Sequence, residues 1–245
     1  MMDLWNKIRT EATGIWKEPM MAGTVEAFVL DHATFEDALL YLLSYKLQDE
    51  NTSQLEIMEE LEKVAGQYPI IFKYALEDLE TSFRRDYAQK RYADVLLFSN
   101  GFVAIQSQRF AHWYFNNGKV ATAKFIQSSV LKNFGIDIHP GACLGKGLVF
   151  DHGTGIVIGE TSVIEDGVFM FHNVTLGGTG KGDGDRHPKI GKNVLIGAGA
   201  TLLGNIHIGE GANIAAGAMV LKDVPEGKTV AGVPAKIVGE AGQVQ

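Results

Sequence analysis

Two side chains in the second half of the chain have the types and spacing needed for proton transfer. His152 stands in the segment FDHGTG, and Asp137 lies fifteen residues before it. A hydroxyl is a poor nucleophile at neutral pH, and a histidine is the side chain best suited to take its proton. A nearby carboxylate would hold the ring tautomer and stabilise the imidazolium. The alternatives are a solvated surface histidine and a turn-capping aspartate.

The element that must position this pair is indicated by an apolar residue that recurs every six positions. A period of six fits neither an α-helix nor an alternating strand. It predicts a β-solenoid in which three six-residue units form one triangular coil and the apolar residues stack inward. The series runs through Ile138, Leu144 and Phe150, then Ile158, Ile164, Met170 and Leu176, then Ile190, Ile196, Leu202, Ile208, Ile214 and Val220.

The series has two defects, and both coincide with candidate site residues. A two-residue slip contains His152 and should push its side chain out of register into a cleft. With that slip, Asp137 lies about one coil away, so the two residues should occupy adjacent rungs. The second defect is the Gly-rich interruption GGTGKGDGDRHPK, which contains Lys181 and Arg186. The thirteen units make about four coils, which is enough for a stable stack.

The first half has apolar residues at helical spacing. The pattern predicts helices over 34–47, with Thr34 as the cap, over 54–67 and over 72–84. Residues 102–134 form either one long helix or a hairpin broken near Asn117-Gly118. The predicted fold class is α+β, with an α-helical domain over 1–135, a β-solenoid over 136–230 with a loop at 177–189, and a C-terminal tail over 231–245.

Composition excludes several classes of protein. The chain has 245 residues, 46% of them apolar, a net charge of −7 and a pI near 5.5, which argues against a nucleic-acid binder. Its N-terminus lacks the apolar region of a signal peptide, and no stretch of apolar residues is long enough to span a membrane. Cys143 is the single cysteine, so no intrachain disulfide is possible, and we expect a small buried residue in a cytoplasmic protein.

Several segments resemble one enzyme family, the serine O-acetyltransferases, within the hexapeptide-repeat acyltransferases. In the second half these are FGIDIHPGACLGKGLVFDHGTGIVIGET, VTLGGTGKGDGDRHPKIGKNVLIGAGATLLGNI and VAGVPAKIVG; in the first half they are RRDYAQKRY and GFVAIQSQRFAHWY. The resemblance covers about residues 25 to 239. It implies a left-handed parallel β-helix and transfer of acetyl from acetyl-CoA to L-serine, giving O-acetyl-L-serine and CoA, the first step of cysteine biosynthesis from serine.

The resemblance also assigns roles to residues. The family's catalytic pair falls on His152 and Asp137, acting by direct transfer without an acyl-enzyme. Arg186 and His187 would meet the serine carboxylate, since the guanidinium fork can bind both carboxylate oxygens. Asp151 would meet the ammonium together with Asp86, which comes from the helical half.

For acetyl-CoA, the resemblance implies a cleft between two solenoids. Its lining would include the backbone of Gly178 and Thr179 and the small residues Ala198 and Ala216, and Lys236 could meet a phosphate of the cofactor. We expect no metal.

The family further implies an assembly and its regulation. Sites between solenoids imply a homotrimer, and the helical halves would join two trimers into a hexamer. L-cysteine would inhibit at the serine site. Many members end in a longer segment with a terminal Ile that docks into O-acetylserine sulfhydrylase. Because this sequence stops at GEAGQVQ, we expect weak or absent binding to that enzyme.

Other functions stay open on the sequence alone. A sister hexapeptide acetyltransferase could use a sugar or xenobiotic acceptor, and any solenoid can serve as a non-catalytic scaffold. Some left-handed β-helices hold zinc with three histidines and act as carbonic anhydrases. The second half offers five histidines for such a site: His139, His152, His172, His187 and His207.

Overall fold

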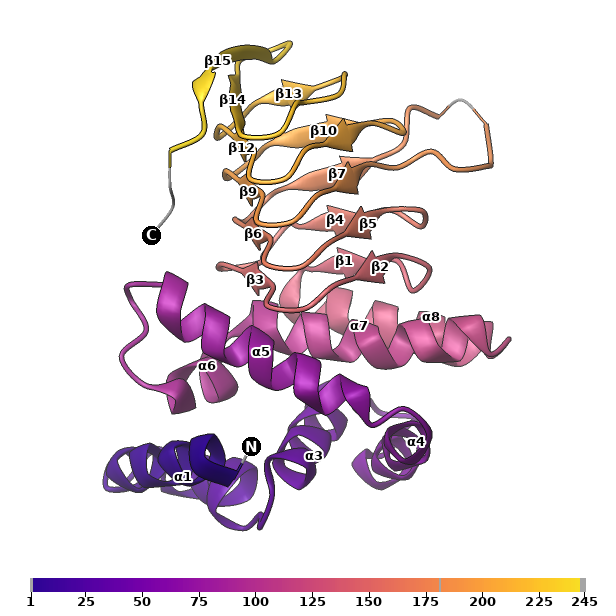
Figure 1. The fold of residues 1–245 in the computed structure, drawn as a ribbon. Coiled ribbons are helices and arrows are strands. Elements are labelled where there is room, and N and C mark those ends of the chain that lie inside the picture. The colour runs from indigo at the N-terminus through magenta and orange to yellow at the C-terminus, as the bar shows by residue number, and fades with distance from the viewer. Residues whose placement is uncertain (1, 181, 243–245) are drawn as a thin grey trace.

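The first half of the molecule is helical in the computed structural model, which describes residues 2–180 and 182–242. Figure 1 shows these helices gathered beneath a tall solenoid. In chain order they are α1 (Met2–Trp16), α2 (Ala22–Val25), the π-helix η1 (Glu26–Leu30), α3 (Phe35–Leu47), α4 (Gln54–Gln67), α5 (Ile70–Arg85), α6 (Tyr92–Phe98), α7 (Asn100–Asn116) and α8 (Val120–Phe134).

Local signals at the helix ends agree with the sequence predictions. Thr34 caps α3 by accepting a hydrogen bond from the Asp37 N–H at 3.1 Å. The helices over 34–47 and 54–67 are confirmed, and the predicted helix over 72–84 lies inside the longer α5. The segment 102–134 is a hairpin of α7 and α8, broken where Gly118 takes a φ of +75°. The sequence analysis did not predict α1, α2, η1 or α6.

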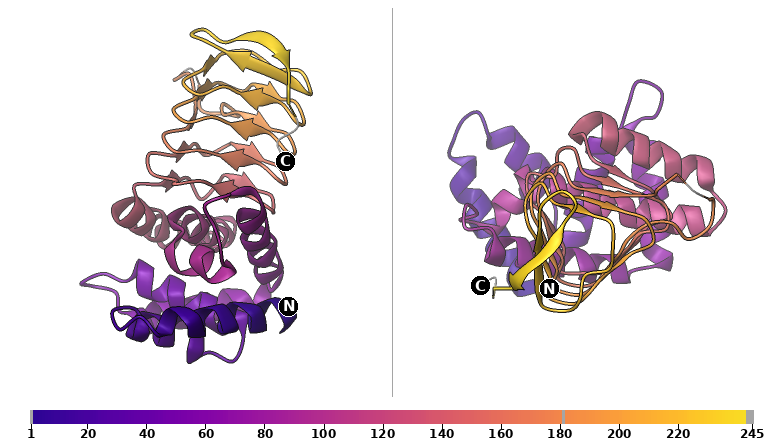
Figure 2. Two further views of the ribbon diagram at one scale, coloured as in Figure 1. Left: turned by 90° about the vertical axis from the view of Figure 1, so that its left-hand side faces the viewer. Right: turned by 90° about the horizontal axis from the view of Figure 1, so that it is seen from above.

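The second half is a left-handed parallel β-helix whose short strands form three sheets. Seen from above in Figure 2, its coils outline a triangle. Sheet A contains β1 (Asp137–Ile138), β4 (Val157–Ile158), β7 (Thr175–Gly177), β10 (Thr201–Leu203) and β13 (Met219–Val220). Sheet B contains β2 (Cys143–Leu144), β5 (Val163–Ile164), β8 (Lys189–Ile190) and β11 (His207–Ile208). Sheet C contains β3 (Val149–Phe150), β6 (Phe169–Met170), β9 (Leu195–Ile196), β12 (Asn213–Ile214), β14 (Lys228–Ala231) and β15 (Lys236–Glu240).

The six-residue period accounts for the core of the solenoid. In sheet A, Ile138 pairs with Ile158, which pairs with Leu176, so equivalent residues of successive coils lie in direct register. All the predicted inward positions are buried except Leu144, which is partly buried. Cys143, next to it, is exposed, so the expectation of a buried cysteine is wrong. Its side chain points outward because inward and outward positions alternate along β2.

The turns between sheets stack into three corners, each named by the two sheets that it joins. The A–B corner comprises 139–142, 159–162, 178–188, 204–206 and 221–223. The B–C corner comprises 145–148, 165–168, 191–194, 209–212 and 225–227. The C–A corner comprises 151–156, 171–174, 197–200 and 215–218.

Helices α5 and α7 close the lower end of the solenoid, where the first coil would otherwise present unpaired backbone groups. Gln108 Nε2 donates to the Ala142 carbonyl at 2.8 Å, and Arg109 Nη1 donates to the Leu144 carbonyl at 3.4 Å. The Leu148 N–H donates to the buried Asp78 carboxylate at 2.8 Å. An open sheet edge invites unwanted pairing, so these bonds both protect the edge and dock the helices.

The upper part of the solenoid carries two departures from its regular coils. The loop between β7 and β8 projects from the side of the solenoid in Figure 1, at the predicted 177–189, although Lys181 lies outside the described residues. The predicted tail begins inside β14 and includes β15, which pairs antiparallel with β14. Its final residues 243–245 also lie outside the described part.

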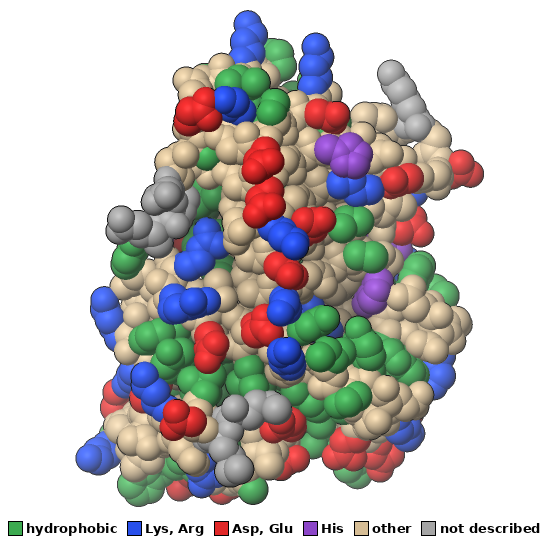
Figure 3. All heavy atoms as spheres, viewed as in Figure 1, with side chains coloured by type: hydrophobic (Ala, Val, Ile, Leu, Met, Phe, Trp, Pro, Cys, Tyr) green, Lys and Arg blue, Asp and Glu red, His purple; other side chains and the backbone are tan. Residues whose placement is uncertain are grey.

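The surface shown in Figure 3 mixes acidic and basic side chains along the solenoid. In the described part of the chain, no helix is both long enough and apolar enough to cross a membrane.

Candidate active site

One pocket at the foot of the C–A corner brings together three of the predicted site residues. Asp86, Asp151 and His152 line a cavity of about 430 Å³ between the end of α5, the start of α7 and the first coil. Asp86 caps the C-terminus of α5, while Asp151 and His152 directly follow β3. Residues 65 positions apart in sequence therefore meet because α5 docks against the first coil.

His152 owes its place to the two-residue slip. The slip adds length to the C–A corner, and the backbone of His152 takes a φ of +57°. Residues other than glycine rarely adopt this conformation. Its side chain is 72% exposed, so a substrate can reach it. Its Nε2 lies 3.8 Å from Asp151 Oδ1. A strained, exposed histidine inside a pocket fits a chemical role better than a packing role.

The two carboxylates of the pocket favour a cationic ligand. Burial raises the pKa of Asp151, and the nearby Asp86 carboxylate raises it further, while His152 and His172 act in the opposite direction. Asp86 accepts hydrogen bonds from the Ala88 N–H and from Gln89 Nε2, which hold its carboxylate in place. An ammonium group placed between the two carboxylates would relieve their mutual repulsion.

His172 is a residue of this corner to which the sequence analysis assigned no role beyond a possible zinc ligand. Its ring stands edge-on to that of His152, with 5.6 Å between the ring centroids. Its Nδ1 is buried and has no hydrogen-bond partner among the described residues. The six-residue repeat could have identified His172 as a site residue, because His172 lies one coil above His152.

A second cluster occupies the A–B corner and contains the other two predicted serine ligands. His187 is buried, and its Nδ1 faces the Thr161 N–H at 3.2 Å and the Thr161 hydroxyl at 2.9 Å. Both groups donate, so the ring proton resides on Nε2, which remains able to donate. Burial lowers the pKa of His187, and the positive charges of Arg186 and Lys189 lower it further.

Close packing around His187 depends on Gly159. A Cβ added to this glycine would lie 2.0 Å from His187 Cδ2, so only glycine fits there. Arg186 forms an ion pair with Glu160 at 2.6 Å and donates to the carbonyls of Asp183 and Gly184. The predicted carboxylate-binding guanidinium is therefore already oriented by groups of its own loop.

Asp137 does not meet His152 within one chain. Among the hydrogen bonds of the described residues, its carboxylate accepts from Gln127 Nε2 of α8 at 2.7 Å. Its charge acts on His139 of the A–B corner, as do the charges of Glu160 and Arg186. Asp137 lies on β1 of sheet A, the sheet that joins the C–A corner to the A–B corner, and no ion pair of the described residues joins it to His152.

The residues predicted to bind acetyl-CoA divide between the same two corners. Ala198 and Ala216 lie above His172 on the C–A corner, where the Ala198 carbonyl accepts from the Gly217 N–H at 2.9 Å. Gly178 and Thr179 lie on the A–B corner, and a Cβ on Gly178 would stand 3.5 Å from His187 Nε2. Lys236 is exposed at the start of β15.

The arrangement therefore consists of two half-sites on different corners of one solenoid. The C–A corner and the adjoining end of α5 offer an imidazole and two carboxylates, and the A–B corner offers a guanidinium and an imidazole N–H. Asp137 lies on β1 of sheet A, between these two corners. Residues 2–180 and 182–242 contain no group of three or more His, Cys, Asp or Glu side chains that could hold a metal ion.

Two family models match the chain. One, described as serine acetyltransferase, N-terminal, matches residues 4–107, and the other, described as bacterial transferase hexapeptide (six repeats), matches residues 187–222. The chain is 46% identical over 240 residues to the serine acetyltransferase of Salmonella typhimurium, covering 98% of this chain and 88% of that one. It is 44% identical to the Haemophilus influenzae serine acetyltransferase, with 98% and 90% covered.

Solved structures give the same result. The Brucella abortus serine acetyltransferase in complex with coenzyme A superposes with a TM-score of 0.96 at 43% identity, covering 98% of this chain and 96% of that one. The soybean serine acetyltransferase complexed with serine superposes with a TM-score of 0.93 at 42% identity, with 96% and 97% covered.

Proposed function

Because this chain belongs to the serine acetyltransferase family, we propose that His152 is the base with which it transfers acetyl from acetyl-CoA to L-serine. The observation that carries the proposal is the single pocket lined by Asp86, Asp151 and His152. It places a proton acceptor next to carboxylates that suit the ammonium of an amino acid.

The reaction is a direct transfer. His152 takes the proton of the serine hydroxyl as the oxygen attacks the thioester carbonyl. The tetrahedral intermediate then collapses, the C–S bond breaks, and the imidazolium returns the proton to the departing CoA thiolate. Cys143 is exposed on sheet B, which is not one of the two sheets that meet at the corner of His152, and this supports a transfer without an acyl-enzyme.

Serine recognition requires both half-sites. Asp86 and Asp151 bind the ammonium, and Arg186 and His187 Nε2 bind the carboxylate. Since these pairs lie on different corners, one complete site forms when the C–A corner of one protomer meets the A–B corner of the next. In a closed ring of three protomers, every half-site meets its complementary half-site on a neighbouring protomer. In that ring, Asp137 of one protomer is brought to His152 of its neighbour, where it orients the imidazole.

The same junction holds acetyl-CoA. Ala198 and Ala216 form one wall and Gly178 and Thr179 the other, and the absence of bulky side chains leaves room for the extended cofactor. Lys236 binds one of the phosphates of acetyl-CoA. We also propose that the helical parts of two trimers join to form a hexamer.

L-cysteine is proposed as an inhibitor at the serine half-sites. It carries the same ammonium and carboxylate as serine, so Asp86 and Arg186 cannot discriminate between them. Inhibition should be competitive with L-serine, and initial rates at several serine concentrations check this. Inhibition that persists at saturating serine would place cysteine elsewhere.

The deciding experiment measures thiol release from acetyl-CoA with and without L-serine. We expect serine-dependent release by the unaltered protein and a loss of kcat of about 10² to 10⁴-fold for His152→Ala. The matched control is His207→Ala, because His207 is an exposed histidine of β11 that lies outside the proposed site. Equal rates for His152→Ala and the unaltered protein, or turnover with galactosides or chloramphenicol in place of serine, would contradict the proposal.

A further inference from the structure

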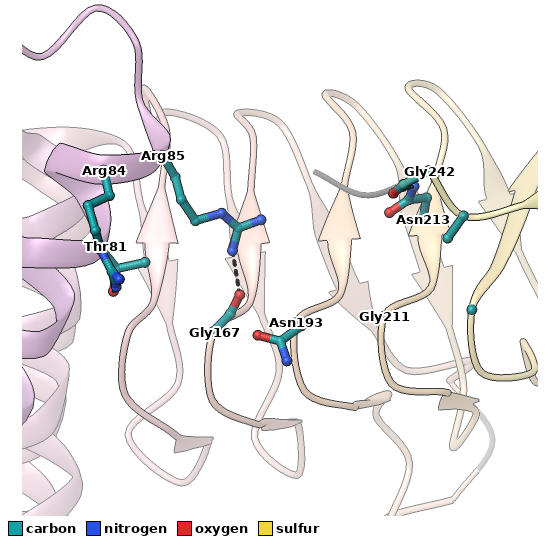
Figure 4. Close-up of a pocket in the computed structure, with 10 residues that line it drawn as sticks. Thr81, Arg84, Arg85, Gly167, Asn193, Gly211, Asn213 and Gly242 are labelled. Atoms are coloured by element: carbon teal, nitrogen blue, oxygen red, sulfur yellow. Dashed lines mark hydrogen bonds between the residues drawn. The ribbon is translucent and has the colours of Figure 1, made fainter. Parts of the chain in front are cut away.

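The third corner of the solenoid carries a groove that the proposed reaction does not use. The groove has a volume of about 660 Å³ and runs along the B–C corner, between the C-terminal end of α5 and the segment that follows β15. Figure 4 shows Arg84 and Arg85 at one end, Gly242 at the other, and Asn193 between them. The volume falls in the range of small-molecule sites.

Two arginines, consecutive in α5, line one end of this groove. Arg85 reaches from α5 to the solenoid, where its Nη1 donates to the Gly167 carbonyl at 2.6 Å, and its guanidinium lies over the Phe169 ring at 5.0 Å. Arg84 donates to Thr81 Oγ1 at 3.2 Å. Neither arginine forms an ion pair with any residue of the described part of the chain.

Arg85 is partly buried and Arg84 is exposed, so only the Arg85 guanidinium is partly withdrawn from water. Burial lowers the pKa of Arg85, and the like charge of Arg84 lowers it further, with no carboxylate acting in the opposite sense. Charges removed from water are normally paired with an opposite charge. The negative end of the α5 dipole favours both arginines, but it does not explain why Arg85 extends across the groove to an aromatic ring and a carbonyl.

The remaining walls suit a polar molecule larger than a simple ion. Added Cβ atoms at Gly211 and Gly227 would meet nothing within 4 Å, so the corner is open there. The amide side chains of Asn193 and Asn213 line the same groove and can donate or accept.

We propose that this groove is a binding site for a small molecule bearing a phosphate group, with the phosphate held by Arg84 and Arg85. A guanidinium pair matches the oxygens of a phosphate and makes charge-assisted hydrogen bonds to it. The rest of the molecule lies along the B–C corner between Asn193 and Asn213. The site is separate from the two corners that form the proposed catalytic junction.

Calorimetric titration of the full chain with inorganic pyrophosphate tests the proposal. We expect one site per protomer and a dissociation constant below about 1 mM at low salt. Arg84→Gln/Arg85→Gln should bind at least about tenfold more weakly, since two charge-assisted hydrogen bonds are lost. Lys222→Gln, which removes an exposed charge on the A–B corner, should bind like the unaltered protein.

Two further measurements keep the result unambiguous. Pyrophosphate should still bind with saturating CoA present, because CoA occupies a different corner; displacement by CoA would overturn the proposal. Arg85→Lys retains the charge and should bind with intermediate affinity, and the melting temperature of each variant reports whether it folds. The proposal also fails if the unaltered protein does not bind up to about 10 mM, or if the double variant binds equally well. None of these measurements depends on acetyl transfer.

Discussion

At the scale of single residues, the site is defined by side chains held in unusual circumstances. His152 combines a left-handed backbone with an exposed ring, and Asp151 is partly buried beside a second carboxylate. His187 is buried with its Nδ1 accepting from Thr161. These are features expected of groups that bind and react, because a purely structural residue would relax to a less strained or better solvated position.

The buried imidazole of His187 leads to a prediction about pH. Its pKa in the folded chain is lowered below the usual value of 6.5, so the unfolded chain binds the proton more readily. The free energy of unfolding should therefore rise with pH from the folded pKa up to about 6.5 and level off above it. Urea unfolding at pH 5.5 and pH 7.5 measures this difference.

The substitution His187→Gln separates this histidine from the others. It should reduce the loss of stability between pH 7.5 and pH 5.5, because a glutamine does not titrate. His207→Gln, in which an exposed histidine is removed, should leave the loss unchanged. An unaltered pH dependence in His187→Gln would show that other groups cause the acid sensitivity.

At the scale of elements, the placement of α5 decides whether the pocket of Asp86, Asp151 and His152 exists. Asp78 of α5 is fully buried; its Oδ2 pairs with Arg109 of α7 at 2.5 Å, and its Oδ1 accepts from the Leu148 N–H of the first coil. Two turns later the same helix ends at Asp86, in the pocket of His152. One buried carboxylate thus fixes helix, hairpin and solenoid relative to one another.

Removing the Asp78 carboxylate should strongly destabilise the protein. Asp78→Ala leaves Arg109 buried without its partner, and we expect the free energy of unfolding to fall by about 3 to 5 kcal/mol. Lys63→Ala, which breaks an exposed ion pair with Glu60, should destabilise the protein far less, because water screens exposed charges. Urea unfolding monitored by tryptophan fluorescence compares the two. Similar losses for both variants would mean that the Asp78 network contributes little to docking.

At the scale of the whole molecule, the separation of the half-sites on two corners makes assembly part of the proposed chemistry. The proposed base on one corner and the proposed carboxylate-binding groups on another could not act on one serine within a single solenoid. The proposed trimer removes this difficulty, since each protomer supplies both corners and every junction is equivalent.

Mixed assemblies test this arrangement directly. His152→Ala and Arg186→Ala should each be nearly inactive alone. When equal amounts are unfolded together and refolded, about a quarter of the junctions combine an intact His152 with an intact Arg186 from the neighbour. Activity should therefore recover to about a quarter of that of the unaltered protein. The double variant refolded with either single variant should show no recovery, and a mixture that stays inactive would indicate that each site lies within one chain.

Local sequence patterns alone were enough to predict much of the fold. The six-residue period predicted the solenoid and its inward residues, because strand and turn geometry repeats over a few residues. The slip identified the corner of His152, the cap Thr34 and apolar spacing located α3, and apolar spacing located α4. Acidic and basic site residues were assigned through the family resemblance, not through the period.

The tertiary structure decided what no local pattern encodes. It placed Asp86 beside Asp151, kept Asp137 on β1 without an ion pair to His152 among the described residues, paired Arg186 with Glu160, and left Cys143 exposed. Each of these features depends on the docking of α5 and α8 and on the register of the stacked coils. Both are set by contacts between residues that are far apart in the chain. Period and capping act over single turns, whereas these contacts arise only when all the elements pack together.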